Sequence, residues 1–233
     1  MTFNVIATGS TGNAVVINDS ILIDCGVPYK ALEPVKKDLK LVLLTHVHSD
    51  HFKPFTAWKL HMERPGLRFA CCEWIVERLL GEGIAKRVID VLEPRTIYSY
   101  YVGIDQRVEI MPEKLVHDVP NCGYHISFCG GWSNTFRDDF KERLFYATDT
   151  ATLDGVEARD YDLYLIEANH TREELEARTK AKLEAGQYAY EYRAAANHLS
   201  QEQALDWLYQ QMGPHSKYVF LHQHQERSKP DAQ

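Results

Sequence analysis

The chain lacks the sequence features of membrane and exported proteins. No apolar run approaches the roughly 20 residues that a helix needs to cross a bilayer. The stretch from Met1 to Val5 contains no basic segment followed by an apolar core, which is the pattern of a secretory signal. We therefore expect a cytoplasmic protein that has no membrane partner.

Cysteine pairs and an excess of positive charge are also missing. The five cysteines include no Cys-x-x-Cys pair, which favours reduced thiols over a disulfide framework. The formal net charge of −7 argues against a broad basic surface that captures nucleic acid. It does not exclude a nucleic-acid substrate, because divalent metal ions would bring positive charge to the site itself.

No low-complexity segment, internal repeat or linker-like stretch divides the chain. The 233 residues are 45% hydrophobic and 25% charged, which is ordinary for a globular protein. This length is enough to bury one sizeable core. We expect a single domain that covers residues 1–233.

Short apolar runs separated by turn residues predict most of the secondary structure. The expected strands are 4–7, 14–17, 21–24, 41–44, 107–110, 114–116, 124–128, 144–147, 161–166 and 218–221. The expected helices are 28–37, 53–61, 73–81, 171–185 and 200–212, and the last two have the charged, apolar-periodic pattern of amphipathic helices.

The most informative stretch follows the apolar run 41–44. Its sequence, Thr45-His46-Val47-His48-Ser49-Asp50-His51, places three imidazoles and a carboxylate at the end of a predicted strand. His46 and His48 can face one ion, whereas Asp50 and His51 would face a neighbouring position, so the spacing predicts two metal ions. Imidazole ligands suit zinc, and an added carboxylate extends the range to manganese or iron.

Further candidate ligands come directly after other predicted strands. They are His117, Asp149, Glu167 and His222. Because each follows a strand, the carboxyl ends of the strands are expected to converge on one rim, where an α/β scaffold presents its functional groups. Taken alone, Asp149 is also compatible with a helix N-cap in Thr148-Asp149-Thr150.

In this order, the histidine loop with His117, Asp149 and His222 resembles the metal-binding motifs of metallo-β-lactamase-fold hydrolases over nearly the whole chain. The resemblance implies an α/β fold, a four-layer αββα sandwich. One ion would be bound by His46, His48 and His117, and the second by Asp50, His51 and His222, with Asp149 bridging both. Two such ions, about 3.5 to 4 Å apart, can hold a bridging hydroxide that attacks a phosphodiester. The ions expected are zinc first, then manganese or iron.

Five further stretches are similar to the YycJ/WalJ-type nucleases, relatives of tRNase Z. They are Gly9-Ser10-Thr11-Gly12-Asn13, Ile23-Asp24-Cys25-Gly26, Ala147-Thr148-Asp149-Thr150, Glu167-Ala168-Asn169-His170 and His198-Leu199-Ser200. The resemblance implies a nucleic-acid phosphodiesterase, with 5′-to-3′ exonuclease activity on DNA favoured.

The same resemblance implies that Glu167 and His198 act together beside the metals, with Asp50 as a further catalytic residue. A histidine held by a carboxylate can stay protonated and give its proton to the leaving oxygen. Taken alone, Glu167 is also compatible with a carboxylate at a helix start, and His198 with a neighbour of the N-cap at Ser200.

The chain departs from the family pattern in three places. Thr171 stands where an acidic residue is expected after Glu167-Ala168-Asn169-His170, which puts a substrate contact at that position in doubt. The sequence 222–226 replaces the usual Leu-Ser and Asn-rich turn, which leaves the last ligand open between His222 and His224. We prefer His222, because it comes first after the apolar Leu221. The segment 130–137 resembles an insertion, and its Trp132 and Phe136 would either stack on bases or pack locally.

Three other histidines lie outside the predicted metal-ligand set. We expect His61 on the surface, His125 as an ordinary sheet residue, and His170 either supporting a ligand or contacting substrate. The competing functions are hydrolysis of a small cyclic nucleotide, which the acidic charge favours, RNA processing, and a metal-stabilised scaffold without activity. The oligomeric state is not predicted.

Overall fold

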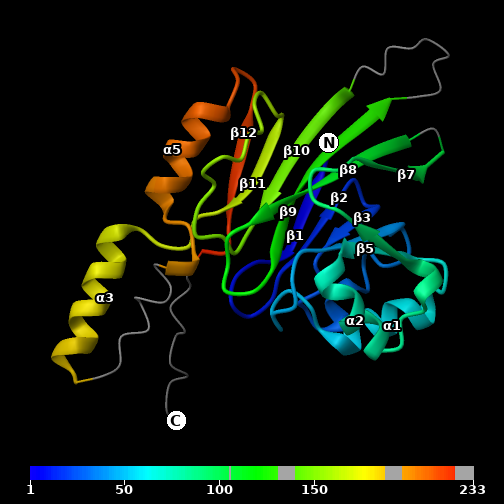
Figure 1. Cartoon of the computed structure of the whole chain (residues 1–233), viewed down its shortest axis with the longest axis horizontal. Coiled ribbons are helices and arrows are strands. Elements are labelled where there is room, and N and C mark those ends of the chain that lie inside the picture. The colour runs from blue at the N-terminus through cyan, green and yellow to red at the C-terminus, as the bar shows by residue number, and fades with distance from the viewer. Residues whose placement is uncertain (105, 131–139, 187–195, 224–233) are drawn as a thin grey trace.

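The computed structural model describes residues 1–104, 106–130, 140–186 and 196–223, and within them the strands form two six-stranded sheets (Figure 1). The first sheet contains β1 (Phe3–Ala7), β2 (Ala14–Ile17), β3 (Ile21–Ile23), β4 (Leu41–Leu44), β5 (Arg68–Cys72) and β6 (Ile89–Leu92), in that spatial order. The second contains β7 (Tyr98–Gly103), β8 (Gln106–Leu115), β9 (Asn121–Gly130), β10 (Phe140–Ala147), β11 (Leu163–Glu167) and β12 (Lys217–Leu221), also in order.

Strand direction brings the candidate site residues to one edge. In the first sheet β3, β4, β5 and β6 run parallel to one another. In the second sheet β10, β11 and β12 are parallel, and β8 shares their direction because both β8 and β10 are antiparallel to β9. The carboxyl ends of β8, β10, β11 and β12 therefore lie along one edge.

An apolar core lies between the two sheets. Ile23 and Leu43 of the first sheet and Ile126 and Leu165 of the second are fully buried and belong to one cluster. The run Leu41–Leu44 is buried at every position because helices also cover the outer face of its sheet. Continuous apolar runs of this kind are typical of such strands.

Helices form the two outer layers. Helices α1 (Pro54–Glu63) and α2 (Glu73–Gly81) lie on the first sheet, and α5 (Gln201–Gln211) lies on the second (Figure 1). The buried face of α5 presents Trp207 and Leu208, and the Trp207 ring contacts Phe145 and Tyr164. The predicted α/β class with a four-layer αββα sandwich is confirmed. The single domain over 1–233 stays a prediction.

The predicted helix 28–37 is wrong. The structure has a short 3₁₀ helix, η1 (Tyr29–Leu32), followed by turns. Pro34 has no backbone N–H and cannot donate the hydrogen bond to Lys30 that an α-helix requires. The turns place Lys36 instead in an ionic cluster with Glu33 and Glu63.

Strands β5, β6 and β7 were not predicted, and the expected strands 107–110 and 114–116 are a single strand, β8. The missed strands carry mixed or aromatic sequences without a clear alternation of polar and apolar residues. Their neighbours in the sheet stabilise them: Arg68 of β5 pairs with Asp90 of β6, for example. A second short 3₁₀ helix, η2 (Lys86–Val88), leads into β6.

Helix α3 (Arg172–Glu184) lies where a helix was expected, but it is not amphipathic. None of its residues, all of which the structure describes, is buried. A capping box formed by Thr171 and Glu174 closes its first turn, and strong helix formers such as Ala, Glu, Lys and Arg fill the rest. Local propensity therefore accounts for this helix. Helix α5, by contrast, is amphipathic as predicted.

Some sequence-based predictions lie outside the described residues. These include the alternative ligand His224 and the two aromatic residues of the segment 130–137, Trp132 and Phe136. No helix in the described part of the chain is long and apolar enough to cross a membrane.

The cysteines yield a first prediction. All five are buried, and burial raises the pKa of the Cys25 and Cys71 thiols to about 12. Because the thiolate is the reactive form, we expect less than one thiol per chain to react with a chromogenic thiol reagent at pH 8 within minutes. Unfolding in guanidinium should expose all five. Rapid reaction of the native protein would contradict the buried, reduced arrangement.

Candidate metal centre

The predicted site residues of both sheets meet at the carboxyl ends of the strands. His46, His48, Asp50 and His51 lie in the loop after β4, His117 lies after β8, Asp149 after β10 and His222 after β12. Every one of them belongs to at least one group of donor atoms that all lie within 4.8 Å of one another. The structure thus brings together all seven residues that the sequence singled out as ligands.

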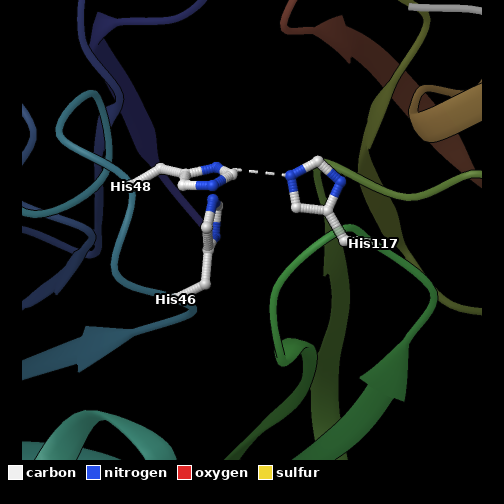
Figure 2. Close-up of side chains that lie close together, drawn as sticks. All are labelled: His46, His48 and His117. Carbon is white, nitrogen blue, oxygen red and sulfur yellow. Dashed lines mark hydrogen bonds between the residues drawn. The ribbon is translucent and has the colours of Figure 1, made fainter. Parts of the chain in front are cut away.

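His46, His48 and His117 form the first donor set. His46 and His48 approach from the loop after β4, and His117 approaches from the opposite side (Figure 2). Nδ1 of His48 lies 3.4 Å from Nε2 of His117. Nε2 of His46 is buried and has no hydrogen-bond partner among the described residues. A cation fits this convergence, because buried polar atoms without a partner are costly.

Asp50, His51 and His222 form the second donor set. Nε2 of His222 lies 3.5 Å from Oδ2 of Asp50, and it is also buried without a hydrogen-bond partner among the described residues. Asp149 lies between the two sets. Its Oδ2 is 2.6 Å from Nε2 of His51, and its Oδ1 is 4.0 Å from Nε2 of His117. This placement fits a carboxylate shared by two ions.

The backbone is strained at two of the candidate ligands, Asp149 and His222, and at the neighbouring Asp24. Asp24, Asp149 and His222 adopt positive φ angles of 58°, 54° and 49°, a conformation that costs a non-glycine residue of order 1–3 kcal/mol. Each lies at the end of a strand, where the turn redirects the side chain into the cluster. Residues 150–160, all of which the structure describes, contain no helix. The interpretation of Asp149 as a helix N-cap is therefore wrong.

Most of the imidazoles are held from outside the cluster through their second ring nitrogen. Nδ1 of His46 contacts Thr45 Oγ1 at 3.0 Å, Nδ1 of His51 contacts Asp24 Oδ2 at 2.7 Å, and Nδ1 of His117 contacts the Asn197 carbonyl at 3.2 Å. An acceptor on one nitrogen fixes the ring orientation and leaves the other nitrogen free to bind metal. The Nε2 atoms therefore face the interior as ligand atoms would.

Asp24 is the principal residue that the sequence analysis left without a role. It is fully buried, accepts the N–H and hydroxyl hydrogen bonds of Thr45, and contacts His51. Because Thr45 in turn contacts His46, Asp24 supports one imidazole from each donor set. The signal was available: Asp24 follows the apolar run Ile21–Ile23 in the same way that the candidate ligands follow their strands.

A glycine allows the Asp24 turn to approach the histidine loop. A Cβ atom at Gly26 would lie 1.7 Å from the carbonyl oxygen of Asp50, so only glycine fits. The close approach lets the Cys25 N–H donate to the His51 carbonyl at 2.9 Å. It also aligns Asn13, whose side chain lies 2.8 Å from Nε2 of His51.

We expect Asp24→Ala to be strongly destabilising. It removes the acceptor of the buried Thr45 N–H and the partner of His51, and breaking such a network costs about 3–5 kcal/mol. The melting temperature of the metal-free protein should fall by roughly 6–20 °C, because each kcal/mol lowers it by about 2–4 °C in a chain of this size. Asp38→Ala, at an exposed position, is the matched control. Equal melting temperatures for the two variants would refute this role of Asp24.

Burial lowers the pKa of several histidines in the cluster, whereas nearby carboxylates raise it. Burial lowers the pKa of His46 and of His117, which favours the neutral form that binds metal. At His222, burial also opposes protonation, but the charge of Asp149 and the contacts with Asp50 and Glu167 outweigh it and raise its pKa to about 10. The carboxylate side of the cluster therefore attracts positive charge, which divalent ions can supply.

His198 and Glu167 lie beside the cluster. Nδ1 of His198 is 2.6 Å from Oε1 of Glu167 and 3.4 Å from Oδ1 of Asp149. Glu167 is the last residue of β11, so it does not start a helix, and its Oε2 accepts the Thr150 N–H at 3.0 Å. The His198 ring stacks on His222, with centroids 5.2 Å apart. The predicted pair is thus in contact with Asp149.

Three histidines outside the donor sets were given separate expectations, and the structure agrees with only some of them. His61, expected on the surface, is buried, and its ring accepts a hydrogen bond from the Ala85 N–H. The faces of the short helix α1 could not be assigned from the sequence alone. His125 is a sheet residue as expected, and its ring contacts the Tyr161 hydroxyl. His170 is buried next to Asn169, whose side chain contacts His222, and its two possible roles stay predictions.

A family model described as the beta-lactamase superfamily domain matches residues 19–222. This span contains both donor sets together with Glu167 and His198. The chain belongs to the metallo-beta-lactamase superfamily. Family membership and the converged donor sets identify it as a metal-dependent hydrolase. The finer resemblance to YycJ/WalJ-type nucleases stays a prediction.

Solved structures of the superfamily share this fold. The metallo-beta-lactamase fold protein YhfI from Bacillus subtilis is 15% identical, with a TM-score of 0.64, and the match covers 95% of this chain and 85% of YhfI. A diphosphatase of the PhnP family is 12% identical, with a TM-score of 0.61 and the same two coverages, 95% and 85%. The long form RNase Z from yeast is 13% identical, with a TM-score of 0.65, and the match covers 99% of this chain but 38% of that enzyme. A comparison with curated protein sequences finds no significant match.

Proposed function

We propose that this superfamily member is a two-metal phosphodiesterase that cleaves nucleic acid. The observation that carries the proposal is the contact of the His198–Glu167 pair with Asp149, at 3.4 Å from His198 Nδ1 to Asp149 Oδ1. This places a proton donor beside the carboxylate that would be shared by the two ions. Hydrolysis of a phosphodiester needs such a donor, because the departing alkoxide is strongly basic.

The two donor sets would hold the two ions. His46, His48 and His117 would bind the first and Asp50, His51 and His222 the second, with Asp149 contacting both. When bound, two divalent ions supply a nucleophile at neutral pH and neutralise the charge that develops on the phosphate. The imidazole-rich first set favours zinc, and the carboxylates of the second also suit manganese or iron.

His198 has the environment of a general acid. Burial opposes its protonation, but the hydrogen bond and charge of Glu167 outweigh burial and raise the pKa of His198. Glu167 is fully buried and contacts Nδ1 of the ring. With Nδ1 engaged, Nε2 is the nitrogen that would face a substrate, and the side chain is 19% exposed. In this arrangement His198 would protonate the leaving oxygen.

Nucleic acid is the proposed substrate class, with DNA favoured and attack from the 5′ end. The similarity of the Asp24-Cys25-Gly26 and His198-Leu199-Ser200 stretches to the nuclease group supports this choice. Structural neighbours named as an RNase Z and a PhnP-family diphosphatase are consistent with phosphate-ester chemistry. The net charge of −7 favours contacts concentrated near the metal ions over a long basic track.

A small cyclic nucleotide is the second candidate substrate. The same net charge of −7 favours it, because an anionic surface repels a polymer carrying many phosphates more than a ligand carrying one or two. Both candidates use the same metal centre and the same His198–Glu167 pair.

A substrate panel tests the proposal. Metal-free protein is supplemented with zinc or manganese and offered single- and double-stranded DNA, RNA, bis-(p-nitrophenyl) phosphate and cyclic dinucleotides. DNA labelled or blocked at one end reports the direction of attack. We expect metal-dependent degradation of DNA that disappears in Asp50→Ala. Turnover that survives both Asp50→Ala and chelation would exclude the two-metal mechanism, and turnover of cyclic dinucleotides alone would favour the second candidate.

A further inference from the structure

His48 differs from the other candidate histidine ligands in its surroundings. Its side chain is 36% exposed, whereas the side chains of His51, His117 and His222 are at most 5% exposed. Protein groups inside the fold hold the second ring nitrogens of those residues. An exposed imidazole can rotate, and water can occupy either nitrogen. The orientation of His48 therefore needs another source of restraint.

The carboxylate of Asp118 lies beside Nε2 of His48. Its Oδ1 is 3.5 Å from Nε2 of His48, and Nδ1 of the same ring faces Nε2 of His117 at 3.4 Å. The two ring nitrogens thus have different partners, the Asp118 carboxylate for Nε2 and His117 for Nδ1, and the same carboxylate oxygen also lies 3.2 Å from Nε2 of His117. A neutral imidazole carries one N–H. A carboxylate next to Nε2 favours the form with the proton there and the Nδ1 lone pair directed inward.

Asp118 and His48 come from different sheets. Asp118 follows His117 directly, in the loop after β8, whereas His48 lies in the loop after β4. The carboxylate is therefore anchored to the residue that supplies the third imidazole of the same set. Its contact with His48 joins the two halves of the set across the edges of both sheets. This arrangement parallels the contact between Asp24 and His51, at 2.7 Å.

Asp118 lies outside the inner ring of donors. Its Oδ1 is 3.2 Å from Nε2 of His117, but the group of donor atoms within 4.8 Å of one another that contains His48 and His117 is completed by His46 and does not include Asp118. A carboxylate beside two of the three imidazoles, and outside their common group, can act on the ion through the imidazoles.

We propose that Asp118 is a positioning residue that orients His48 and so tunes metal binding by the first donor set. This rests on one part of the proposed function, the assignment of His46, His48 and His117 to one ion. Partners of this kind in metalloproteins change metal affinity by about 10- to 100-fold when they are removed. Asp118 is thus expected to set how tightly the first ion is held.

The test measures binding of the metal alone. Metal-free wild type, Asp118→Ala and Asp118→Asn are titrated with zinc in competition with a chromophoric chelator. Asp118→Ala should weaken one of the two binding steps by about 10- to 100-fold. Asp118→Asn should stay within about threefold of wild type, because its amide oxygen still accepts a hydrogen bond. Asp154→Ala, at an exposed position after β10, is the control. Wild-type affinity in Asp118→Ala would overturn the proposal.

Cobalt substitution separates positioning from direct ligation. The visible absorption of bound cobalt reports the number and type of its ligands. We expect the cobalt-loaded Asp118→Asn protein to keep the band positions and intensities of wild type. A change of coordination in that variant would show that Asp118 is itself a ligand and would overturn the positioning role. Far-ultraviolet circular dichroism verifies that both variants are folded.

These measurements separate this inference from the proposed function. If wild type binds two ions and Asp118→Ala weakens one, but no phosphodiester is cleaved, the nuclease proposal fails and the role of Asp118 stands. If wild type cleaves DNA and Asp118→Ala binds zinc normally, the role of Asp118 fails and the nuclease proposal stands.

Discussion

Asp149→Ala is expected to lower metal-dependent hydrolysis by about 10⁴-fold or more, equivalent to roughly 5.5 kcal/mol in the activation barrier. Asp149 is 3% exposed, and its two oxygens approach both donor sets: Oδ2 lies 2.6 Å from Nε2 of His51 in the second set, and Oδ1 lies 4.0 Å from Nε2 of His117 in the first. Its removal would take a ligand from both ions at once and leave His51 and His222 without their shared carboxylate. A loss of this size follows because two-metal chemistry needs both ions in place.

The same variant has a readout that does not depend on activity. The number of metal ions bound per chain, measured on the purified protein, should fall from two to one or none. Asp154→Ala provides the matched control, because it removes an exposed carboxylate a few residues along the same loop. Circular dichroism establishes that the variant is folded. If Asp149→Ala retains two ions and a rate within tenfold of wild type, the shared-carboxylate arrangement is wrong.

His198→Ala should lower kcat by about 10²- to 10⁴-fold, the usual contribution of a general acid, while two metal ions stay bound. The ring contacts Glu167 at 2.6 Å and stacks on His222. His198 is not one of the six residues assigned to the two donor sets, although its donor atom lies within 4.8 Å of those of Asp149, Glu167 and His222. His215→Ala, in an exposed turn, is the control. An unaltered kcat would show that His198 is not the general acid, whereas a scaffold without activity would show no turnover in wild type and variant alike.

The leaving group distinguishes an acid from a structural residue. A nucleotide alkoxide needs a proton to depart, whereas p-nitrophenolate is stable without one. The deficit of His198→Ala should therefore be much smaller on bis-(p-nitrophenyl) phosphate than on DNA. Glu167→Gln should show the same dependence on the leaving group, since Glu167 acts through His198. Equal losses on both substrates would indicate that His198 supports the shape of the site and donates no proton.

Much of the fold was predictable because its signals are local. The apolar runs 41–44 and 218–221 correspond to strands β4 (Leu41–Leu44) and β12 (Lys217–Leu221), and Ser200 caps the start of α5 with a capping box. Apart from the predicted helix 28–37, which Pro34 interrupts, the errors occurred where the deciding interaction is not local. Arg68 and Asp90 pair between neighbouring strands, and His61 is buried by packing that the pattern of helix α1 does not reveal.

The candidate site likewise has features that local sequence predicts and features that depend on tertiary contacts. The sequence by itself determined the donor types, their order and their position after strands, since these follow from residue identity and short-range periodicity. Only the tertiary structure decided that the loops after β4, β8, β10 and β12 meet, that Glu167 contacts His198 across 31 positions of sequence, and that Asp24 holds His51. Those contacts depend on how two sheets pack and on which way each strand runs. Neither property can be predicted from a local stretch of residues, because packing depends on the burial of apolar faces over the whole chain.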